Sequence, residues 1–358
     1  MATEAERERA RASVELLARR VARVPSELAR AALPPSTELP DLRGATRWVV
    51  SGIGASEGPA RLLVSQLLSQ GLSARFLPVT SFLSKEPPTG DVLVVFSQRL
   101  SPNGRIPLGA EHRRRFRHVL LVTSLDPETD ARAAELLDAG VRLLRHGPVD
   151  EDGLFLRVLG PALAARMSLY IACETARLRG APEPAWAARL PELPNAVERA
   201  WTRAGTLDPS WLFGPTAIVA SGDDVDLAPA LRTKLLEALG AGEPVIWDHC
   251  GLVHGPLQSF LESPRLLLVL ESHAEPHGAF LRERLCRVLH PELHRVHVLE
   301  ATLPHPLGLF EHAAAMDTLV VEALRARPRD LGNWPGKGQD APIYALDGTE
   351  PALSAKPG

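Results

Sequence analysis

The N-terminal part of the chain has the apolar spacing of an amphipathic helix. From Thr3 to about Ala32, apolar residues recur at steps of three and four positions, which places them on one helical face. The proline-rich sequence LPPSTELPD ends this helix, because proline lacks a backbone donor and disfavours the helical turn before it. The apolar face must be covered, either by the same chain or by a second copy of it. Its residues are Val14, Leu17, Val21, Val24 and Leu28.

Beyond this helix, short β-rich runs alternate with longer stretches of helical periodicity. Such alternation is typical of parallel sheets covered by helices. A connector with four prolines, RGAPEPAWAARLPELPNAVERAW, separates two such series. The expected strands are 48–51, 74–79, 92–96, 119–123 and 141–144 in the first series, and 217–221, 244–247, 266–270 and 296–299 in the second. The expected helices are 59–69, 108–116, 129–139, 154–178, 227–239, 278–288 and 309–326.

The two series also match in sequence. WVVSGIGASEGPARLLVSQLLSQG and AIVASGDDVDLAPALRTKLLEALG share a strand, Ser-Gly, a loop, Pro-Ala and a helix at one constant offset. A duplicated unit is the simplest explanation. We therefore predict an α/β fold with two similar three-layer αβα units, each with a parallel five-stranded sheet, after the N-terminal helix. The predicted boundaries are 1–43 for the helix and linker, 44–180 for the first unit, 181–210 for the connector, 211–346 for the second unit and 347–358 for the tail.

The composition is that of a globular protein. The chain has 358 residues, of which 45% are hydrophobic and 23% charged, and two domains with real cores are expected. A net charge of -3 and 5% aromatic residues argue against a nucleic-acid partner. The charged N-terminus lacks the apolar core of a signal peptide, and no run approaches the ~20 apolar residues that span a bilayer. A cytoplasmic protein without a membrane segment is the expectation.

Cysteines and histidines show no metal-binding pattern. Cys173, Cys250 and Cys286 lie far apart, which predicts neither a disulfide framework nor a thiolate site and fits a reducing compartment. The runs WDHCGLVHG and HPELHRVH are rich in histidine, but neither has a ligand spacing that recurs in a second element, as a structural zinc site would. We predict no metal and no cofactor.

Two loops of the first series carry candidate binding residues. In open parallel sheets, ligands bind beyond the carboxyl ends of the strands, where loops and helix N-termini present unpaired N–H groups. SGIGASEG places Gly54 and Ser56 at such an end, although a tight turn with a serine near a helix N-cap explains this loop equally well. FSQRLSPNG adds further polar side chains after the strand at 92–96, namely Ser97, Gln98, Arg99 and Ser101.

These motifs in tandem resemble the double sugar-isomerase (SIS) domain family, which includes the isomerase half of glucosamine-6-phosphate synthase. Gly54-Ala55-Ser56 falls on the family's Gly-Thr-Ser, and Ser97-Gln98 begins its Ser-Gln-Ser-Gly-Glu-Thr loop. In the second series, the family has a helix with Lys and Glu three apart and then a His-Gly-Pro turn. Lys234, Glu237 and His254-Gly255-Pro256 match these. The resemblance covers most of 44–345, without the synthase's glutaminase domain.

The phosphate loop departs from the family. Arg99, Leu100, Ser101 and Pro102 stand where the family has Ser-Gly-Glu-Thr, so two hydroxyls that bind sugar phosphate in the family are missing. The guanidinium of Arg99 could replace them, because it binds phosphate or carboxylate in a bidentate pair. The alternative is that Arg99 points to solvent.

The C-terminal tail departs as well. In NWPGKGQDAPIYALDG, Asp340 and Pro342 match the synthase, but its active-site lysine is replaced by Asp347. Lys337 is the nearby candidate to replace that lysine.

The resemblance implies roles in aldose–ketose chemistry. Glu237 would move a proton between C1 and C2 if burial raised its pKa, and His254 would open the sugar ring. Lys234, one turn before Glu237, would set the charge of that carboxylate or form a carbonyl adduct. A surface Lys/Glu pair is the simpler alternative. Placing Glu237 on the family's base also requires one inserted residue, since the ungapped register gives Leu235 or Ala238.

The expected function is therefore that of a SIS-type enzyme acting on a phosphorylated sugar or a related polar carbonyl compound, as isomerase, aminotransferase-like enzyme or fructosamine deglycase. Two alternatives stay open: a ligand-binding regulator that has lost catalysis, and an enzyme of specialised metabolism whose substrate carries a carboxylate bound by Arg99. The resemblance also implies a homodimer, in which the His-Gly-Pro turn contributes to the partner's site.

Overall fold

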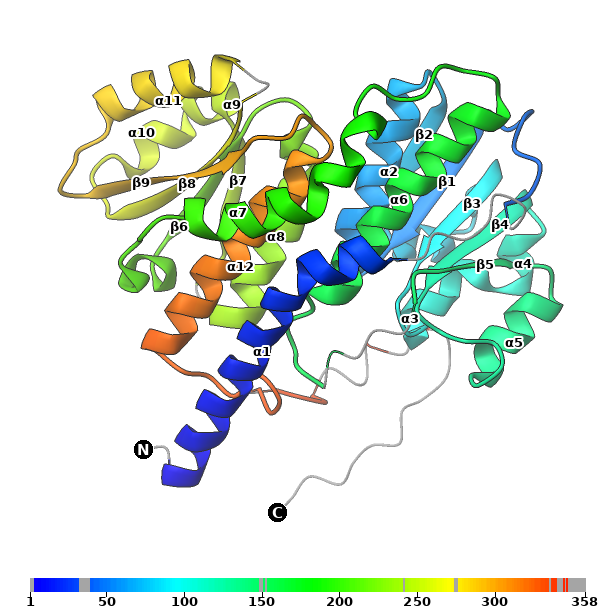
Figure 1. Cartoon of the computed structure of the whole chain (residues 1–358), viewed down its shortest axis with the longest axis horizontal. Coiled ribbons are helices and arrows are strands. Elements are labelled where there is room, and N and C mark those ends of the chain that lie inside the picture. The colour runs from blue at the N-terminus through cyan, green and yellow to red at the C-terminus, as the bar shows by residue number, and fades with distance from the viewer. Residues whose placement is uncertain are drawn as a thin grey trace. The chain divides into compact units, whose positions relative to one another are not determined.

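The computed structural model describes residues 3–31, 39–147, 151, 153–240, 242–273, 276–334, 336–339, 344 and 346 (Figure 1). The chain forms two compact units. The five-stranded unit consists of Ala31–Asp150, Gly160–Pro184 and Asn333–Gly358. The four-stranded unit consists of Met1–Arg30, Glu151–Leu159 and Ala185–Gly332. The tail positions Asp340, Pro342 and Asp347 lie outside the described residues.

The five-stranded unit is built on a parallel sheet with the order β2-β1-β3-β4-β5. All five strands expected in the first series are present. The strands are β1 (Arg47–Gly52), β2 (Ser73–Phe76), β3 (Gly90–Phe96), β4 (Phe116–Thr123) and β5 (Arg142–Arg145). The helices are α2 (Glu57–Ser69), α3 (Pro102–Arg105), α4 (Ala110–Arg113), α5 (Ala131–Asp138) and α6 (Leu159–Leu178), so the helix expected at 108–116 is replaced by short pieces.

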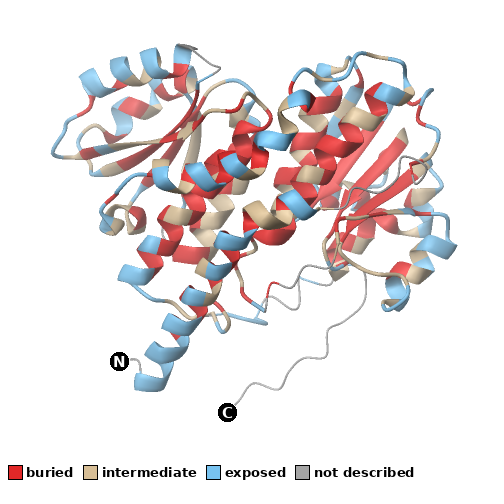
Figure 2. Cartoon of the chain, in the orientation of Figure 1, coloured by how far each residue is buried: buried red, intermediate tan, exposed pale blue. Residues whose placement is uncertain are grey.

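Both faces of this sheet are covered by helices, because successive side chains of a strand point to opposite sides. In β3, Val92 and Val94 pack with α2 and α6, whereas Leu93 and Val95 pack toward the α5 side. The central strands β1, β3 and β4 are accordingly mostly apolar and buried (red in Figure 2), as expected for a parallel sheet with two covered faces, whereas the edge strands β2 and β5 are only partly buried.

The four-stranded unit has a parallel sheet of order β7-β6-β8-β9, which repeats the neighbour order of β2-β1-β3-β4. Our expectation of a fifth strand here was wrong for the described residues. After β9 the chain runs directly into α12, and no further strand and helix intervene as α5 and β5 do in the other unit. The strands are β6 (Thr216–Ala220), β7 (Val245–Asp248), β8 (Arg265–Ser272) and β9 (His294–Ala301).

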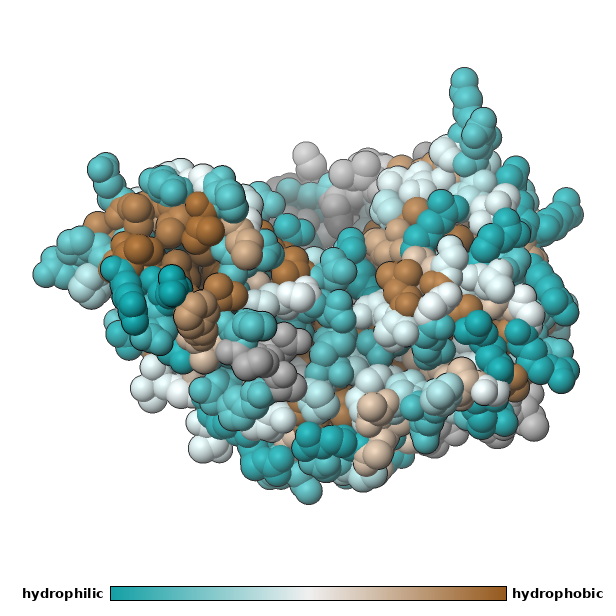
Figure 3. Space-filling model, turned by 90° about the horizontal axis from the view of Figure 1, so that it is seen from above, coloured by the Kyte–Doolittle hydropathy of each residue, from teal (hydrophilic) through white to brown (hydrophobic). Residues whose placement is uncertain are grey.

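Helices α8 and α12 pack on one face of this sheet, and α9 to α11 enclose a second core on the other. Figure 3 shows a hydrophobic area, brown at the left, over the α9–α11 side. Three large apolar side chains of α9 and α11 are exposed: Val253, Phe280 and Val288. The bounds are α7 (Leu193–Arg203), α8 (Asp224–Leu239), α9 (His249–Val253), α10 (Pro256–Phe260), α11 (Pro276–Val288) and α12 (Gly308–Ala326).

Helix α1 (Glu4–Arg30) belongs to the four-stranded unit, where it packs against α7 and α12. The five apolar residues of its predicted stripe are all buried. The stripe is therefore covered by the same chain. None of the helices in the described part of the chain combines the length and the apolar character needed to cross a membrane.

Candidate functional site

The first candidate loop leads from β1 into α2. Gly54 has a positive φ of 57°, a conformation that glycine adopts without strain, and it begins the 3-10 turn Gly54–Ser56. Ser56 precedes α2, but its hydroxyl does not cap that helix. This leaves the Ser56 side chain available at the carboxyl end of β1.

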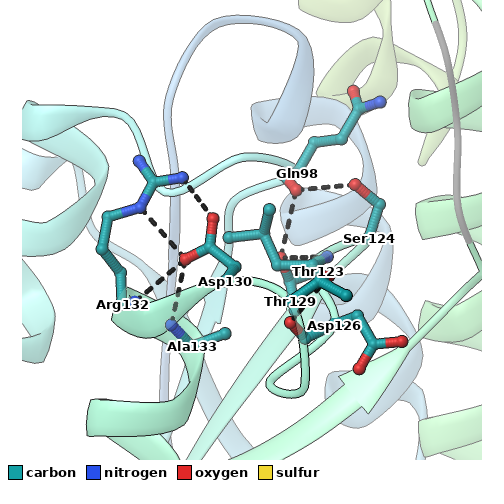
Figure 4. A network of polar contacts seen from close by, with 9 residues as sticks. Gln98, Thr123, Ser124, Asp126, Thr129, Asp130, Arg132 and Ala133 are labelled. Atoms are coloured by element: carbon teal, nitrogen blue, oxygen red, sulfur yellow. Dashed lines mark hydrogen bonds and ion pairs between the residues drawn. The ribbon is translucent and has the colours of Figure 1, made fainter.

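The second candidate loop is fixed by the neighbouring strand. The backbone carbonyl of Gln98 accepts hydrogen bonds from Thr123 Oγ1 at 3.1 Å and from Ser124 Oγ at 2.8 Å. The backbone N–H of Ser97 donates to Val122. In Figure 4 the side chain of Gln98 extends away from Thr123 and Ser124. The loop backbone is thus held by β4, while the carboxamide is free of that network.

A small cavity lies at the carboxyl ends of these strands, within the five-stranded unit. Its volume is about 10 Å³. That is the space for about one water molecule. Four of its lining residues carry polar side chains: Ser56, Ser97, Gln98 and His146.

These polar groups have no partners among the described residues. The Nε2 of Gln98 and the Nδ1 of His146 are both buried without a hydrogen bond to another residue. The hydroxyls of Ser56 and Ser97 make no hydrogen bond within the described chain either. Because buried polar groups in folded proteins are nearly always paired, the two buried atoms of Gln98 and His146, beside the two serine hydroxyls, point to a polar ligand.

The N-terminus of α6 faces the same cavity. Gly160, in the first turn of this helix, lines it, and a Cβ at that position would lie 2.2 Å from Gln98 Oε1. The carboxamide oxygen therefore approaches the helix end closely, where the macrodipole favours negative charge. An anionic oxygen would be favoured at the same place.

The remaining loop residues differ in role. Arg99 is exposed and is not among the residues that line the cavity. Leu100, at the position of the family's glycine, has a left-handed backbone with a φ of 49°, and its side chain is fully buried. The hydroxyl of Ser101 caps α3 by accepting the N–H of Gly104 at 3.3 Å. Ser101 therefore has a structural task.

Glu237 lies on α8 in the four-stranded unit. Burial raises the pKa of Glu237 to about 7, and the charges of Arg157 and Lys234 oppose this only in part. Its Oε2 is buried and has no hydrogen-bond partner. The condition for a carboxylate base at neutral pH, a pKa raised by burial, is met at this residue.

Lys234 is held by a residue that sequence analysis did not find. Its Nζ lies 2.5 Å from Oδ1 of Asp317 on α12, and both side chains are largely buried. Burial raises the pKa of Asp317 above its usual value, and the charge of Lys234 opposes this only in part. Lys234 is thus committed to Asp317, which argues against the simple surface Lys/Glu pair.

His254 follows α9 and is exposed on the four-stranded unit. Gly255, after it, has a φ of 127°, which requires glycine. His254 and Gly255 therefore form a turn at the surface of the unit. Lys337, the replacement considered for the tail lysine, lies with its Nζ 4.8 Å from the ring centre of Trp334.

At the matching edge of the four-stranded unit, the described residues form no anion cradle. Ser221, the counterpart of Ser51, pairs its hydroxyl with Nδ1 of the buried His249 at 2.9 Å. Asp224 stands at the position that matches Gly54, and the neighbouring His305 and His312 help to lower its pKa. A carboxylate at this edge repels anions. No group of three or more His, Cys, Asp or Glu side chains within the described ranges is placed to hold a metal.

Neither a family model nor a curated protein matches the chain. Solved structures do match its fold. The C-terminal domain of glucosamine-fructose-6-phosphate aminotransferase from Francisella tularensis matches with a TM-score of 0.69 at 11% identity, covering 87% of this chain and 95% of that one. Glucosamine-6-phosphate deaminase from Thermotoga maritima matches with 0.66 at 14% identity, covering 88% and 98%. Tagatose-6-phosphate ketose/aldose isomerase from Escherichia coli matches with 0.67 at 15% identity, covering 89% and 95%.

The resemblance indicated by the loop motifs and the His-Gly-Pro turn is therefore confirmed for the fold. The neighbours are SIS-type proteins and include the isomerase part of the aminotransferase.

Proposed function

We propose that the chain is a SIS-type enzyme that moves a proton next to the carbonyl of a phosphorylated sugar or a related polar carbonyl compound. The fold is that of proteins named as sugar-phosphate isomerases, a deaminase and an aminotransferase. Those reactions share proton transfer at the carbon beside a carbonyl group. The proposal is therefore the step that these activities have in common.

Glu237 carries this proposal. Its carboxyl group is largely buried, has one oxygen without a hydrogen bond, and has a pKa raised to about 7 by burial. A base with such a pKa is partly ionised at neutral pH and can both take and return a proton. A Glu on the surface of a helix would have neither the unpaired oxygen nor the raised pKa.

The other roles follow the resemblance. The cavity lined by Ser56, Ser97 and Gln98 would take the anionic group of the substrate, and Gly54 would shape its first loop. His254 would open the ring. Arg99, exposed beside the cavity, would contact the substrate outside it.

Asp317 limits what Lys234 can do. The amino group of Lys234 is directed at the buried carboxylate of Asp317, so it is not placed to form a carbonyl adduct. We therefore assign Lys234 an electrostatic role near Glu237.

A homodimer is part of this proposal. Of the exposed apolar side chains, Val253 belongs to α9, directly before His254, and Phe280 and Val288 belong to α11, which packs in the same core as α9. Covering them with a second copy would also bring His254 to a partner surface. Light scattering of the wild type and of Phe280→Asp tests this, since the charge should convert a dimer to a monomer.

Proton exchange in D₂O tests the catalytic proposal without assuming a product. The protein is incubated with a panel of hexose and pentose phosphates, fructosamine phosphates and sugar acids, and loss of the C1 or C2 proton signal is followed by NMR. We expect exchange with at least one phosphorylated compound and its loss in Glu237→Gln. Exchange that persists in a folded Glu237→Gln variant, or no exchange with any compound, would contradict the proposal.

A regulator without catalysis is the second candidate, and the changed loop favours it. Arg99 and Pro102 stand at the positions of the two hydroxyls that bind phosphate in the family. Binding of a compound from the panel without any proton exchange would establish this alternative. Preference for a carboxylate compound, lost in Arg99→Ala, would instead support an enzyme of specialised metabolism.

A further inference from the structure

His146 is the one polar residue of the cavity that the family loops do not supply. It follows β5, and the residue is only 5% exposed. Its Nδ1 has no hydrogen-bond partner on any other described residue, although it lines the same cavity as Ser56, Ser97 and Gln98. A buried imidazole nitrogen without a partner costs free energy unless a ligand satisfies it.

We propose that His146 contacts the oxyanion of the ligand in this cavity and replaces the hydroxyl donors that the loop has lost at Arg99 and Pro102. This proposal rests on the proposed function, which assigns this cavity to the anionic group of the substrate. The ligand group is a phosphate-type oxyanion, because three neutral donors and the N-terminus of α6 surround the same space.

The volume of the cavity requires one side chain to move. About 10 Å³ holds a water molecule but not a phosphate group. The carboxamide of Gln98 fills the space before Gly160. It is the end of a flexible side chain and is not part of the network that fixes the loop backbone, so it can rotate when an oxyanion enters.

The pKa of His146 is set by burial and not by neighbouring charges. Burial lowers the pKa of His146 to about 4, opposed only by a contact with its own backbone, and no charged neighbour contributes. At neutral pH it is therefore a neutral donor, provided that the proton is on Nδ1. A bound oxyanion would favour the imidazolium and raise this pKa. The charged residues on the adjoining elements do not line the cavity. These residues are Arg99, Arg166, the ion pair of Glu57 with Arg61, and the ion pair of Arg145 with Asp126.

Binding of inorganic sulfate tests the proposal, because sulfate does not titrate near neutral pH whereas phosphate does. Affinities are measured by calorimetry at about pH 5 and about pH 8. For the wild type we expect tighter binding at the lower pH. His146→Ala should bind about ten-fold more weakly than the wild type at about pH 8, as for loss of one hydrogen bond to an anion, and the difference should be larger at about pH 5, where only the wild type gains affinity. His146→Asn keeps a donor and should approach the wild type at about pH 8 but lose the pH dependence.

His112→Asn is the matched control. His112 is a buried histidine of the same unit, its Nδ1 also lacks a partner in the described chain, and it does not line this cavity. The His112→Asn variant should lose about as much stability as His146→Asn, but it should bind sulfate with the affinity of the wild type.

Two results would overturn the proposal. One is equal sulfate affinity and pH dependence in the wild type and in both His146 variants, with or without a loss in Arg99→Ala. The other is no binding of sulfate, inorganic phosphate or a sugar phosphate to the wild type. Catalysis is tested separately by proton exchange and Glu237→Gln, so sulfate binding through His146 without exchange would contradict the proposed function alone.

Discussion

The ammonium of Lys234 forms a buried ion pair with the carboxylate of Asp317, at 2.5 Å, one helical turn from Glu237. Asp317 thereby determines where the positive charge lies. An ammonium directed at Glu237 would stabilise its carboxylate and lower its pKa. Because Lys234 is instead held by Asp317, burial dominates at Glu237 and its pKa stays near 7.

Replacing Lys234 by Met should destabilise the protein strongly. The substitution leaves Asp317, which is 4% exposed, without its counter-ion, and breaking a buried pair costs about 3–5 kcal/mol. Urea unfolding at neutral pH measures the loss. The double variant Lys234→Met/Asp317→Leu should regain most of it, because an apolar pair avoids the desolvation of both charges.

The exposed Arg287–Glu283 pair on α11 is the control for this prediction. Both side chains are mostly exposed, so Arg287→Met should change the stability little. An equally small loss of unfolding free energy in Lys234→Met would contradict a buried ion pair between Lys234 and Asp317 that stabilises the fold.

Glycine should be tolerated better than alanine at Leu100. Either substitution removes a fully buried leucine, which costs about 2–5 kcal/mol. The backbone, however, has a φ of 49°, where a residue with a Cβ is strained by about 1–2 kcal/mol. Leu100→Gly should therefore unfold at a higher urea concentration than Leu100→Ala.

Leu93 gives the matched comparison. It is fully buried in the same apolar cluster as Leu100 but lies within strand β3. In a strand, glycine is less stable than alanine, so the order of the two variants should reverse. The same order at both positions would show that the left-handed backbone at Leu100 is not maintained in solution.

Two glycines near the cavity should respond differently to alanine. At Gly52 a Cβ would lie 2.7 Å from the backbone oxygen of Ser56, which cannot move without distorting the loop, and we expect a loss of about 1–3 kcal/mol. At Gly160 the nearest atom is the end of the Gln98 side chain, which can rotate away. Gly160→Ala should change the free energy of unfolding by less than about 1 kcal/mol. Equal losses in urea unfolding would contradict this difference.

The sequence predicted the regular elements well because their signals are local. Apolar periodicity placed α1 and all nine described strands, and the face formed by Val14, Leu17 and Val21 is buried as expected. The packing role of α7 was not predicted. The prolines of this segment suggested a connector, but α7 buries Leu193, Val197 and Ala200. Proline is compatible with the start of such a helix.

The candidate site was less predictable because its contacts join distant parts of the sequence. No local pattern links Lys234 to Asp317. His146, in contrast, could have been found, since it follows the strand expected at 141–144 and strand ends collect ligand-binding residues. The motif match pointed to Arg99 instead. What distinguishes His146 from Arg99 is its burial and its place in the lining of the cavity, and both depend on the three-dimensional packing.

Glu237 should make the stability of the protein depend on pH in a defined window. Its pKa is about 7 in the folded protein, against an ordinary value of 4.5. Between these values the folded state keeps a proton that the unfolded chain has released, so the free energy of unfolding falls as the pH rises. The full effect is on the order of 3 kcal/mol, because burial raises the pKa from 4.5 to about 7. Glu237→Gln lacks this dependence and should gain stability relative to the wild type from about pH 4 to about pH 8.

Urea unfolding of both proteins across this range measures the difference, and ¹³C NMR of the carboxyl carbons, compared between wild type and variant, identifies the Glu237 signal and its midpoint. A midpoint near the ordinary value, together with parallel stability curves, would mean that water solvates the carboxylate. Glu237 would then lack the burial that makes it a base at neutral pH.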